Sequence, residues 1–139
     1  MRRALPMAAL DAHPRPAGGI IRILVVDDEQ AVRKVVRRSL RAHGYEVIEA
    51  EDGQAALGLL ASEALRPHLV VTDEQMPTMS GRELAAVSSR VYPAVRVLLM
   101  SGAHEAGHGG TAAHGRLQKP FSGSGLVEAV RRVLEPPAE

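Results

Sequence analysis

Short apolar runs alternate with amphipathic stretches along this chain. The run at Leu69–Val71 is unbroken, which is typical of a strand buried on both faces of a parallel sheet. Residues Tyr45–Ala50 instead alternate between polar and apolar, which indicates a strand near a sheet edge. The pattern predicts strands over residues 21–26, 45–50, 68–72 and 95–100, and a fifth strand that leads from Leu117 to Lys119.

Apolar residues that recur every three or four positions predict a helix after most of these strands. The expected helices cover about residues 30–43, 54–64, 81–91 and 124–134. In the first of them, Val32, Val35, Val36 and Leu40 form one apolar stripe, and Gly44 supplies a stop. Strands that alternate with helices in this way predict an α/β fold with a doubly wound parallel sheet.

The length and composition limit the class of protein. A chain of 139 residues suits one domain, which we place at residues 20–135, with a flexible tail at 1–19 and a short tail at 136–139. The absence of cysteine excludes a disulfide framework and fits a reducing compartment, so we expect a cytoplasmic protein. The apolar runs are too short to span a membrane, and a net charge of +1 gives no reason to expect nucleic-acid binding.

Polar side chains stand where the predicted strands end. Asp27 and Asp28 follow the first strand, Asp73 the third and Ser101 the fourth, while Lys119 belongs to the fifth. Right-handed crossovers bring the carboxyl ends of parallel strands to one edge of a sheet, so these residues can converge. Clustered carboxylates with room for water suit Mg²⁺, and a carboxylate beside Mg²⁺, an ammonium and a hydroxyl could accept a phosphoryl group.

Each of these residues also has a simpler explanation. Asp28 can favour the start of a helix, Ser101 can belong to an ordinary turn, and Lys119 can lie in a loop. The functional interpretation gains weight because all of them occur in order, each at the end of an apolar run, on one predicted edge.

Four segments together resemble the receiver domain of two-component response regulators. The segments are Val25–Glu29, Val71–Gly81, Leu98–Gly102 and Leu117–Phe121. The Ser-Gly pair after the fourth strand and the Leu-Gln-Lys-Pro-Phe sequence are especially similar to the receivers at the carboxyl end of hybrid histidine kinases. The resemblance covers the chain from about residue 20 to residue 134.

The resemblance implies a flavodoxin-like sheet of five parallel strands in the order 2-1-3-4-5. It implies that Asp73 takes a phosphoryl group from a phosphohistidine of a histidine kinase or phosphotransfer protein. Asp27 and Asp28, with Asp73 and the main-chain carbonyl of Gln75, would hold Mg²⁺. Ser101 and Lys119 would contact the phosphoryl oxygens, and the bond from this lysine to Pro120 is expected to be cis.

The sequence departs from the family in two places. Family members usually carry an aromatic residue three positions before the lysine, where this chain has Arg116, and a long cation is costly in an apolar slot. Gly107, Gly109 and Gly110 fall where a fourth helix is expected, and glycine costs about 1 kcal/mol in a helix relative to alanine. We therefore expect the fourth helix to be short or disordered.

Three hypotheses for the function follow. The first is a single-domain receiver, most simply a monomer, that is phosphorylated on Asp73 and is not an enzyme for a separate substrate. The alternative is a degenerate receiver that binds partners without a working phospho-switch, which Arg116 would favour. A third is a small phosphatase with Asp73 as its nucleophile, but Gln75 stands where such enzymes carry a second acid.

Overall fold

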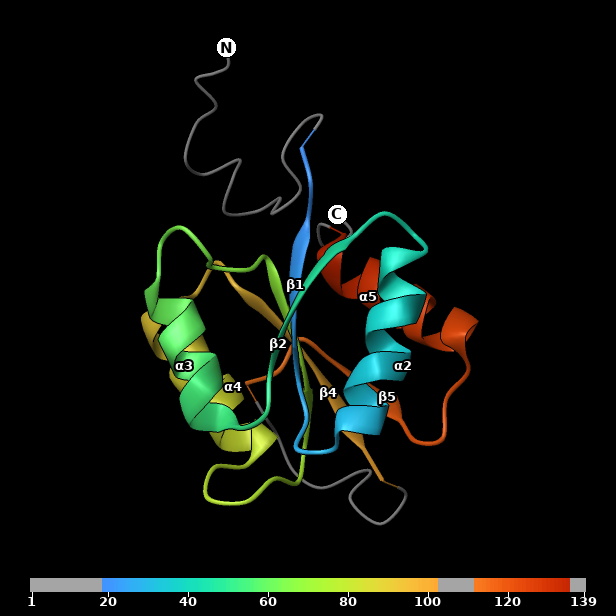
Figure 1. The fold of residues 1–139 in the computed structure, drawn as a ribbon. Coiled ribbons are helices and arrows are strands. Elements are labelled where there is room, and N and C mark those ends of the chain that lie inside the picture. The colour runs from blue at the N-terminus through green and yellow to red at the C-terminus, as the bar shows by residue number, and fades with distance from the viewer. Residues whose placement is uncertain (1–18, 103–111, 136–139) are drawn as a thin grey trace.

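The computed structural model describes residues 19–102 and 112–135. Five parallel strands form one sheet in the order β2-β1-β3-β4-β5, so the predicted topology is confirmed (Figure 1). The strands are β1 (Arg22–Val26), β2 (Glu46–Ala50), β3 (Leu69–Asp73), β4 (Arg96–Ser101) and β5 (Gly115–Gln118). The second strand lies at an edge of the sheet, as its alternating pattern predicted.

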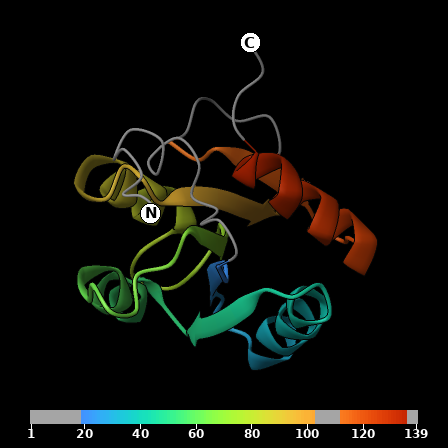
Figure 2. The same cartoon turned by 90° about the horizontal axis from the view of Figure 1, so that it is seen from above.

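Helices cover both faces of the sheet in pairs. They are α2 (Gln30–Arg41), α3 (Gly53–Ala61), α4 (Gly81–Val91) and α5 (Gly123–Leu134). One face is covered by α2 and α5 and the other by α3 and α4, which the view from above shows clearly (Figure 2). Among the described residues, no helix is both long and apolar enough to cross a membrane. Most of the expected fourth helix, residues 103–111, lies outside the described residues, and 112–114 are not helical.

Aliphatic side chains build two hydrophobic layers, one on each side of the sheet. All five residues of β3 are buried, which fits its unbroken apolar run and its central position. In α2, Val36 and Leu40 are fully buried against β1 and α5. The prediction that Val35 faces the core is wrong, because this side chain lies at the border of the buried stripe and is 58% exposed.

Local side-chain chemistry sets the ends of the helices. Gly44 adopts a positive φ of 91° beyond the end of α2, as expected for a residue that stops a helix. The helix α3 begins at Gly53, slightly earlier than predicted, because the Asp52 carboxylate accepts a hydrogen bond from the Ala55 N–H at 2.8 Å. It also ends earlier, at Ala61, since Ser62 has extended backbone angles.

A histidine extends the sheet at the amino end of β3. The His68 N–H donates to the Arg22 carbonyl at 2.8 Å, and its ring Nδ1 accepts from the Arg22 N–H at 3.0 Å. His114 makes the same pair of bonds with Val97 before β5. An imidazole can accept such a bond only while that nitrogen is unprotonated. Each histidine therefore continues the ladder in its neutral form.

We predict that the His68→Asn variant loses less stability on acidification than the wild type. Burial lowers the pKa of His68 and the positive charge of Arg22 lowers it further, although Glu46 opposes this effect. The unfolded state then binds the proton first, so stability is complete above about pH 6.5 and falls as the pH drops below that value. An asparagine amide oxygen can accept from Arg22 without titrating. Urea unfolding at pH 7.5 and pH 5.5 measures the difference, and equal losses in both proteins would contradict it.

Candidate functional site

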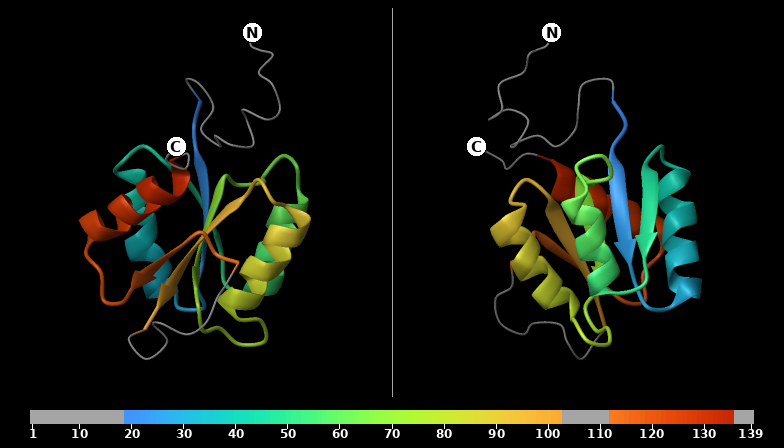
Figure 3. Two further views of the ribbon diagram at one scale, coloured as in Figure 1. Left: turned by 180° about the vertical axis from the view of Figure 1, so that it is seen from behind. Right: turned by 60° about the vertical axis from the view of Figure 1, so that its left-hand side comes forward.

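Three carboxylates gather at the carboxyl ends of β1 and β3. Asp27 and Asp28 directly follow β1, and Asp73 is the last residue of β3. The two strands are neighbours with Val26 opposite Thr72, and their carboxyl ends lie at one edge of the sheet (Figure 3). One ligand oxygen from each of the three aspartates lies within 4.8 Å of the others. The convergence that the sequence predicted for these acids is therefore present.

Asp27 is fully buried within this group. Its Oδ1 accepts a hydrogen bond from the Glu29 N–H at 2.9 Å, whereas its buried Oδ2 has no hydrogen-bond partner among the described residues. Burial raises the pKa of Asp27 to about 6, and the negative charge of Asp73 contributes to the rise while the Glu29 bond opposes it. A buried carboxylate oxygen with no donor is a place where a cation would be stabilised.

Lys119 reaches the acids from beyond the end of β5. Its Nζ lies 2.9 Å from Asp73 Oδ1 and 4.0 Å from Asp27 Oδ2. Burial raises the pKa of the Asp73 carboxyl, which Lys119 partly offsets. Burial alone would lower the pKa of Lys119, but the hydrogen bond to Asp73 and the nearby negative charges raise it above its ordinary value. The lysine is thus held as a cation against the acids.

The backbone fixes Lys119 beside the end of β4. The Lys119 N–H donates to the Ser101 carbonyl at 2.8 Å, and the bond between Lys119 and Pro120 is cis, as expected. Ser101 is the last residue of β4, is 2% exposed, and lies beside Lys119 at the same edge because of this backbone hydrogen bond. Asp28 is exposed, and so is Gln75, which follows β3 in the loop to α4. The six predicted site residues therefore belong to one edge of the sheet.

The loop from β3 to α4 is tied tightly to the sheet. The Glu74 N–H donates to the Met100 carbonyl at 2.8 Å, and the Gly81 N–H donates to the Glu74 carbonyl at 2.9 Å. A Cβ at Gly81 would stand 2.2 Å from the Asp73 carbonyl oxygen, so only glycine fits there. Ser80 then caps α4 in a reciprocal pair of bonds with Glu83. The backbone around Asp73 is thus held by β4 on one side and by the start of α4 on the other.

Sequence reasoning missed the role of Glu74. This residue directly follows Asp73, is 5% exposed, and forms ion pairs with Arg82 of α4 and Arg116 of β5. Arg116, which stands where family members usually carry an aromatic residue, is offered a charged partner rather than an apolar slot, because the Glu74 carboxylate lies 3.1 Å away. An acid at the end of a buried strand was the signal that could have pointed to this pair.

The residues at this edge suit a divalent cation. The cluster presents oxygen ligands only, one of its carboxylate oxygens is buried without a donor, and one acid is open to solvent. Hard oxygen ligands combined with access for water are what Mg²⁺ prefers in proteins. The three aspartates would hold the ion, with Lys119 beside it.

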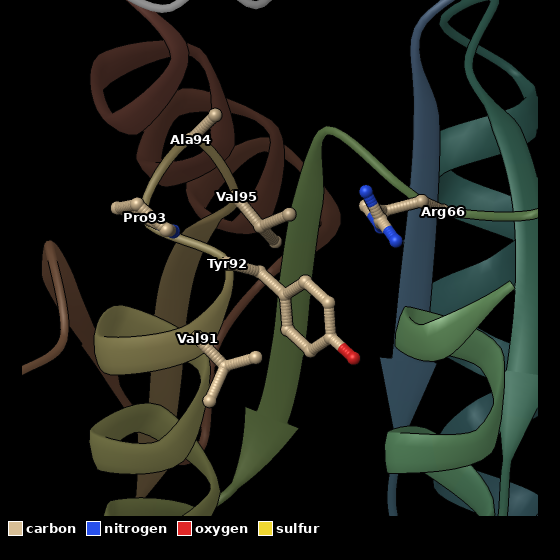
Figure 4. A pocket seen from close by; sticks show the side chains of 6 residues that line it. All are labelled: Arg66, Val91, Tyr92, Pro93, Ala94 and Val95. Atoms are coloured by element: carbon tan, nitrogen blue, oxygen red, sulfur yellow. The ribbon is translucent and has the colours of Figure 1, made fainter. Parts of the chain in front are cut away.

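A pocket at the amino ends of the strands, opposite the acidic cluster, is lined by different kinds of residue. It has a volume of about 300 Å³ and is lined by Arg66, Tyr92 and the residues that lead from α4 into β4 (Figure 4). The Arg66 guanidinium lies 4.7 Å from the centre of the Tyr92 ring, which is a cation–π arrangement. Its lining includes no carboxylate, in contrast to the acidic cluster at the carboxyl ends of the strands.

Comparison with known proteins identifies the family. The sequence profile of the response regulator receiver domain matches residues 23–131. The chain belongs to the receiver family. This receiver has the fold and strand order of the solved receiver domains that it matches, in agreement with the expected flavodoxin-like architecture.

Individual proteins with similar sequences or structures include response regulators and the receiver of a hybrid histidine kinase. It is 53% identical over 64 residues to the response regulator MprA of Mycolicibacterium vanbaalenii, a match that covers 46% of this chain and 27% of MprA. The receiver domain of the hybrid histidine kinase CckA is 36% identical with a TM-score of 0.68, covering 82% and 99% of the two chains. TrrA of Thermotoga maritima, solved with Mg²⁺-BeF, is 32% identical with a TM-score of 0.75, covering 83% and 100%. The chain spans about a quarter of the length of the MprA relatives it matches.

We predict that Asp27→Asn stabilises the metal-free receiver while removing its response to Mg²⁺. The amide keeps an acceptor for the Glu29 N–H and removes the charge of a buried carboxylate whose Oδ2 has no hydrogen-bond partner among the described residues, an arrangement that typically costs about 1–3 kcal/mol. Thermal unfolding with and without Mg²⁺ measures both effects. Glu51→Gln, which removes an exposed charge outside the cluster, serves as the control. An Asp27→Asn variant that is less stable without metal, or that Mg²⁺ still stabilises like the wild type, would contradict the account.

Proposed function

We propose that this receiver accepts a phosphoryl group on Asp73 in a Mg²⁺-dependent phosphorelay. The observation that carries the proposal is the contact of Lys119 Nζ with Asp73 Oδ1 at 2.9 Å, beside the Asp27 Oδ2 that accepts no hydrogen bond within the described part of the chain. A lysine that holds one oxygen of a carboxylate leaves the other available for attack. The two further carboxylates next to Asp73 reduce the stability of the fold, whereas they are suitable ligands for a metal ion.

The chemistry is an in-line displacement at phosphorus. A carboxylate oxygen of Asp73 forms a bond to the phosphorus of a partner's phosphohistidine, and the bond between phosphorus and the imidazole nitrogen breaks. The imidazole leaves and takes a proton from solvent. Lys119 offsets the charge of the equatorial oxygens, and Ser101 at the same edge can donate to one of them. Bound Mg²⁺ would supply the remaining charge neutralisation for the transferring group.

Two relatives support this proposal. TrrA was solved with Mg²⁺-BeF, and the CckA receiver belongs to a hybrid histidine kinase. By similarity, we infer that the phosphoryl donor for this chain is a histidine kinase or a histidine phosphotransfer protein. We propose that the metal ligands are Asp27, Asp28 and Asp73, together with the main-chain carbonyl of Gln75. We also propose that the protein works in the cytoplasm. It catalyses only its own modification.

We predict that acetyl phosphate with Mg²⁺ increases the mass of the protein by one phosphoryl group. The increase should be absent in Asp73→Asn and in wild-type protein treated with a metal chelator, because both remove a part that the displacement needs. Intact-protein mass spectrometry measures it. Labelling of the Asp73→Asn variant to the wild-type level would refute the assignment of the acceptor.

A second candidate function is a receiver that binds its partners without acting as a switch. The observation in its favour is Arg116, which is held by the buried Glu74. If this function holds, the acetyl phosphate experiment gives no labelled protein, while the binding of the partner persists. The same experiment therefore separates the two candidates.

The partner would dock on the face formed by α2 and the segment after β5. An apolar groove of about 590 Å³ lies there, lined by Val32, Val35 and Phe121 and reaching Lys119. The exposed cations Lys34 and Arg38 lie on the same helix as these valines. Such a surface suits a partner with an apolar ridge and acidic side chains.

Not every cation of α2 is available for docking. Arg33 and Arg37 bind the carboxylate of Glu49 on β2, at 3.1 and 2.6 Å. Charge reversal of Arg37 would therefore break an internal ion pair. The exposed pair Lys34 and Arg38 gives the cleaner test.

We predict that Lys34→Glu with Arg38→Glu slows phosphotransfer from the kinase or phosphotransfer protein at least tenfold at low salt, since charge at the rim of an interface governs the association rate. Labelling by acetyl phosphate should not change, because a small donor needs no docking surface. Arg90→Glu, an exposed reversal on α4, provides the control. Unchanged phosphotransfer rates in the double variant would rule out this docking face.

A further inference from the structure

A buried acid between two arginines lies directly beside the acceptor. The Glu74 side chain is only 6% exposed, its Oε1 lies 3.1 Å from Arg116, and its Oε2 is bonded to Arg82. We name these three residues the Glu74 cluster. It connects the carboxyl end of β3 to the first turn of α4 and to β5.

The register of the sheet explains why these side chains meet. Thr72 lies opposite Leu99, and Leu99 lies opposite Arg116, so a row of side chains crosses from β3 over β4 to β5. Glu74 is two residues beyond Thr72 and therefore points to the same face. That face is the one that α4 covers, which brings Arg82 within reach. The pair from Glu74 to Arg116 spans the intervening strand β4.

The cluster is charged, and each member depends on the others. The two carboxylate oxygens of Glu74 face two guanidinium groups, Oε2 that of Arg82 and Oε1 that of Arg116, so a buried negative charge lies between two positive ones. Removal of one arginine leaves the buried carboxylate with one guanidinium partner in place of two, so the group rearranges or takes in water. The backbone of Glu74 lies between the acceptor and Gln75, and it would move with its side chain.

We propose that Arg116 and Arg82, acting through Glu74, are positioning residues for the magnesium site. The cluster holds the end of β3 from two elements, while the Glu74 N–H bond to Met100 and the Gly81 bond hold the same residue through its backbone. The Asp73 carboxylate and the loop after it are thereby fixed in the geometry that receives the cation. This inference rests on the proposed function, because it concerns the affinity of that site for Mg²⁺.

The direction in which Mg²⁺ affinity changes when Arg116 is removed distinguishes a positioning role from a purely electrostatic one. Arg116 is a cation near a site for a cation. If it acted by its charge alone, its removal would strengthen Mg²⁺ binding, since repulsion would fall. If it positions the site, its removal weakens binding. Loss of a residue that orients metal ligands typically costs about tenfold or more in affinity.

Isothermal titration calorimetry with MgCl₂ on the full chain tests the proposal. Calorimetry suits this protein because it has no tryptophan to report binding. Arg116→Gln should bind Mg²⁺ about tenfold more weakly than the wild type. Arg116→Lys, which keeps the charge but not the forked geometry, should recover part of the affinity. Arg90→Gln, an exposed change of the same charge on α4, should leave the affinity unchanged.

A double variant shows whether the effect passes through Glu74. Glu74→Gln should weaken binding, and the addition of Arg116→Gln to it should cause little further loss, because the pair no longer exists. Independent losses that multiply would overturn the proposal. So would unchanged or tighter binding by Arg116→Gln. If circular dichroism shows that Arg116→Gln does not fold, the Arg116→Lys variant provides the test instead. A Mg²⁺ affinity of Arg116→Lys equal to that of the wild type would then overturn the proposal. A wild type that binds no Mg²⁺ would instead reject the proposed function itself.

Discussion

Repulsion among three carboxylates at one edge of a sheet is the constraint on which the rest of this structure depends. Asp27, Asp28 and Asp73 present oxygens within 4.8 Å of one another, and Lys119 offsets only part of their charge. Two unit charges about 4 Å apart interact by roughly 4 kcal/mol at an effective dielectric constant of 20. A fold that keeps such a cluster gives up stability there, and a bound cation returns it. The carboxylate cluster therefore suits a bound divalent cation.

The rest of the molecule serves to hold these acids in place. The strands β1 and β3 are central and buried, so their ends are the best-fixed points of the sheet. The next layer is backbone: Lys119 donates to Ser101, Glu74 donates to Met100, and Gly81 packs directly on the Asp73 carbonyl. Beyond that layer, the Glu74 cluster connects the acceptor strand to α4 and β5.

The sequence predicted the fold and the acids because both follow from local signals. An apolar run shows where a strand ends, and the parallel topology brings all such ends together, so Asp27, Asp73 and Lys119 could be assigned without coordinates. Pairs across the sheet were not predictable in this way. The ion pair between Glu74 and Arg116 joins a loop residue just after β3 to a residue of β5. An acid after a buried strand signals that a charged partner is needed, but it does not identify which residue that partner is. The exposure of Val35 was also missed, because a helical stripe does not define where its border lies.

The location of a bound cation tests the central claim most directly. Crystals of the wild-type protein grown with Mn²⁺, a substitute for Mg²⁺ at oxygen ligands, can be measured by anomalous diffraction. The account predicts one strong peak among the carboxylates of Asp27, Asp28 and Asp73, with Lys119 still beside the acceptor. A structure with no peak there at saturating Mn²⁺, or with the ion bound elsewhere on the sheet, would contradict it.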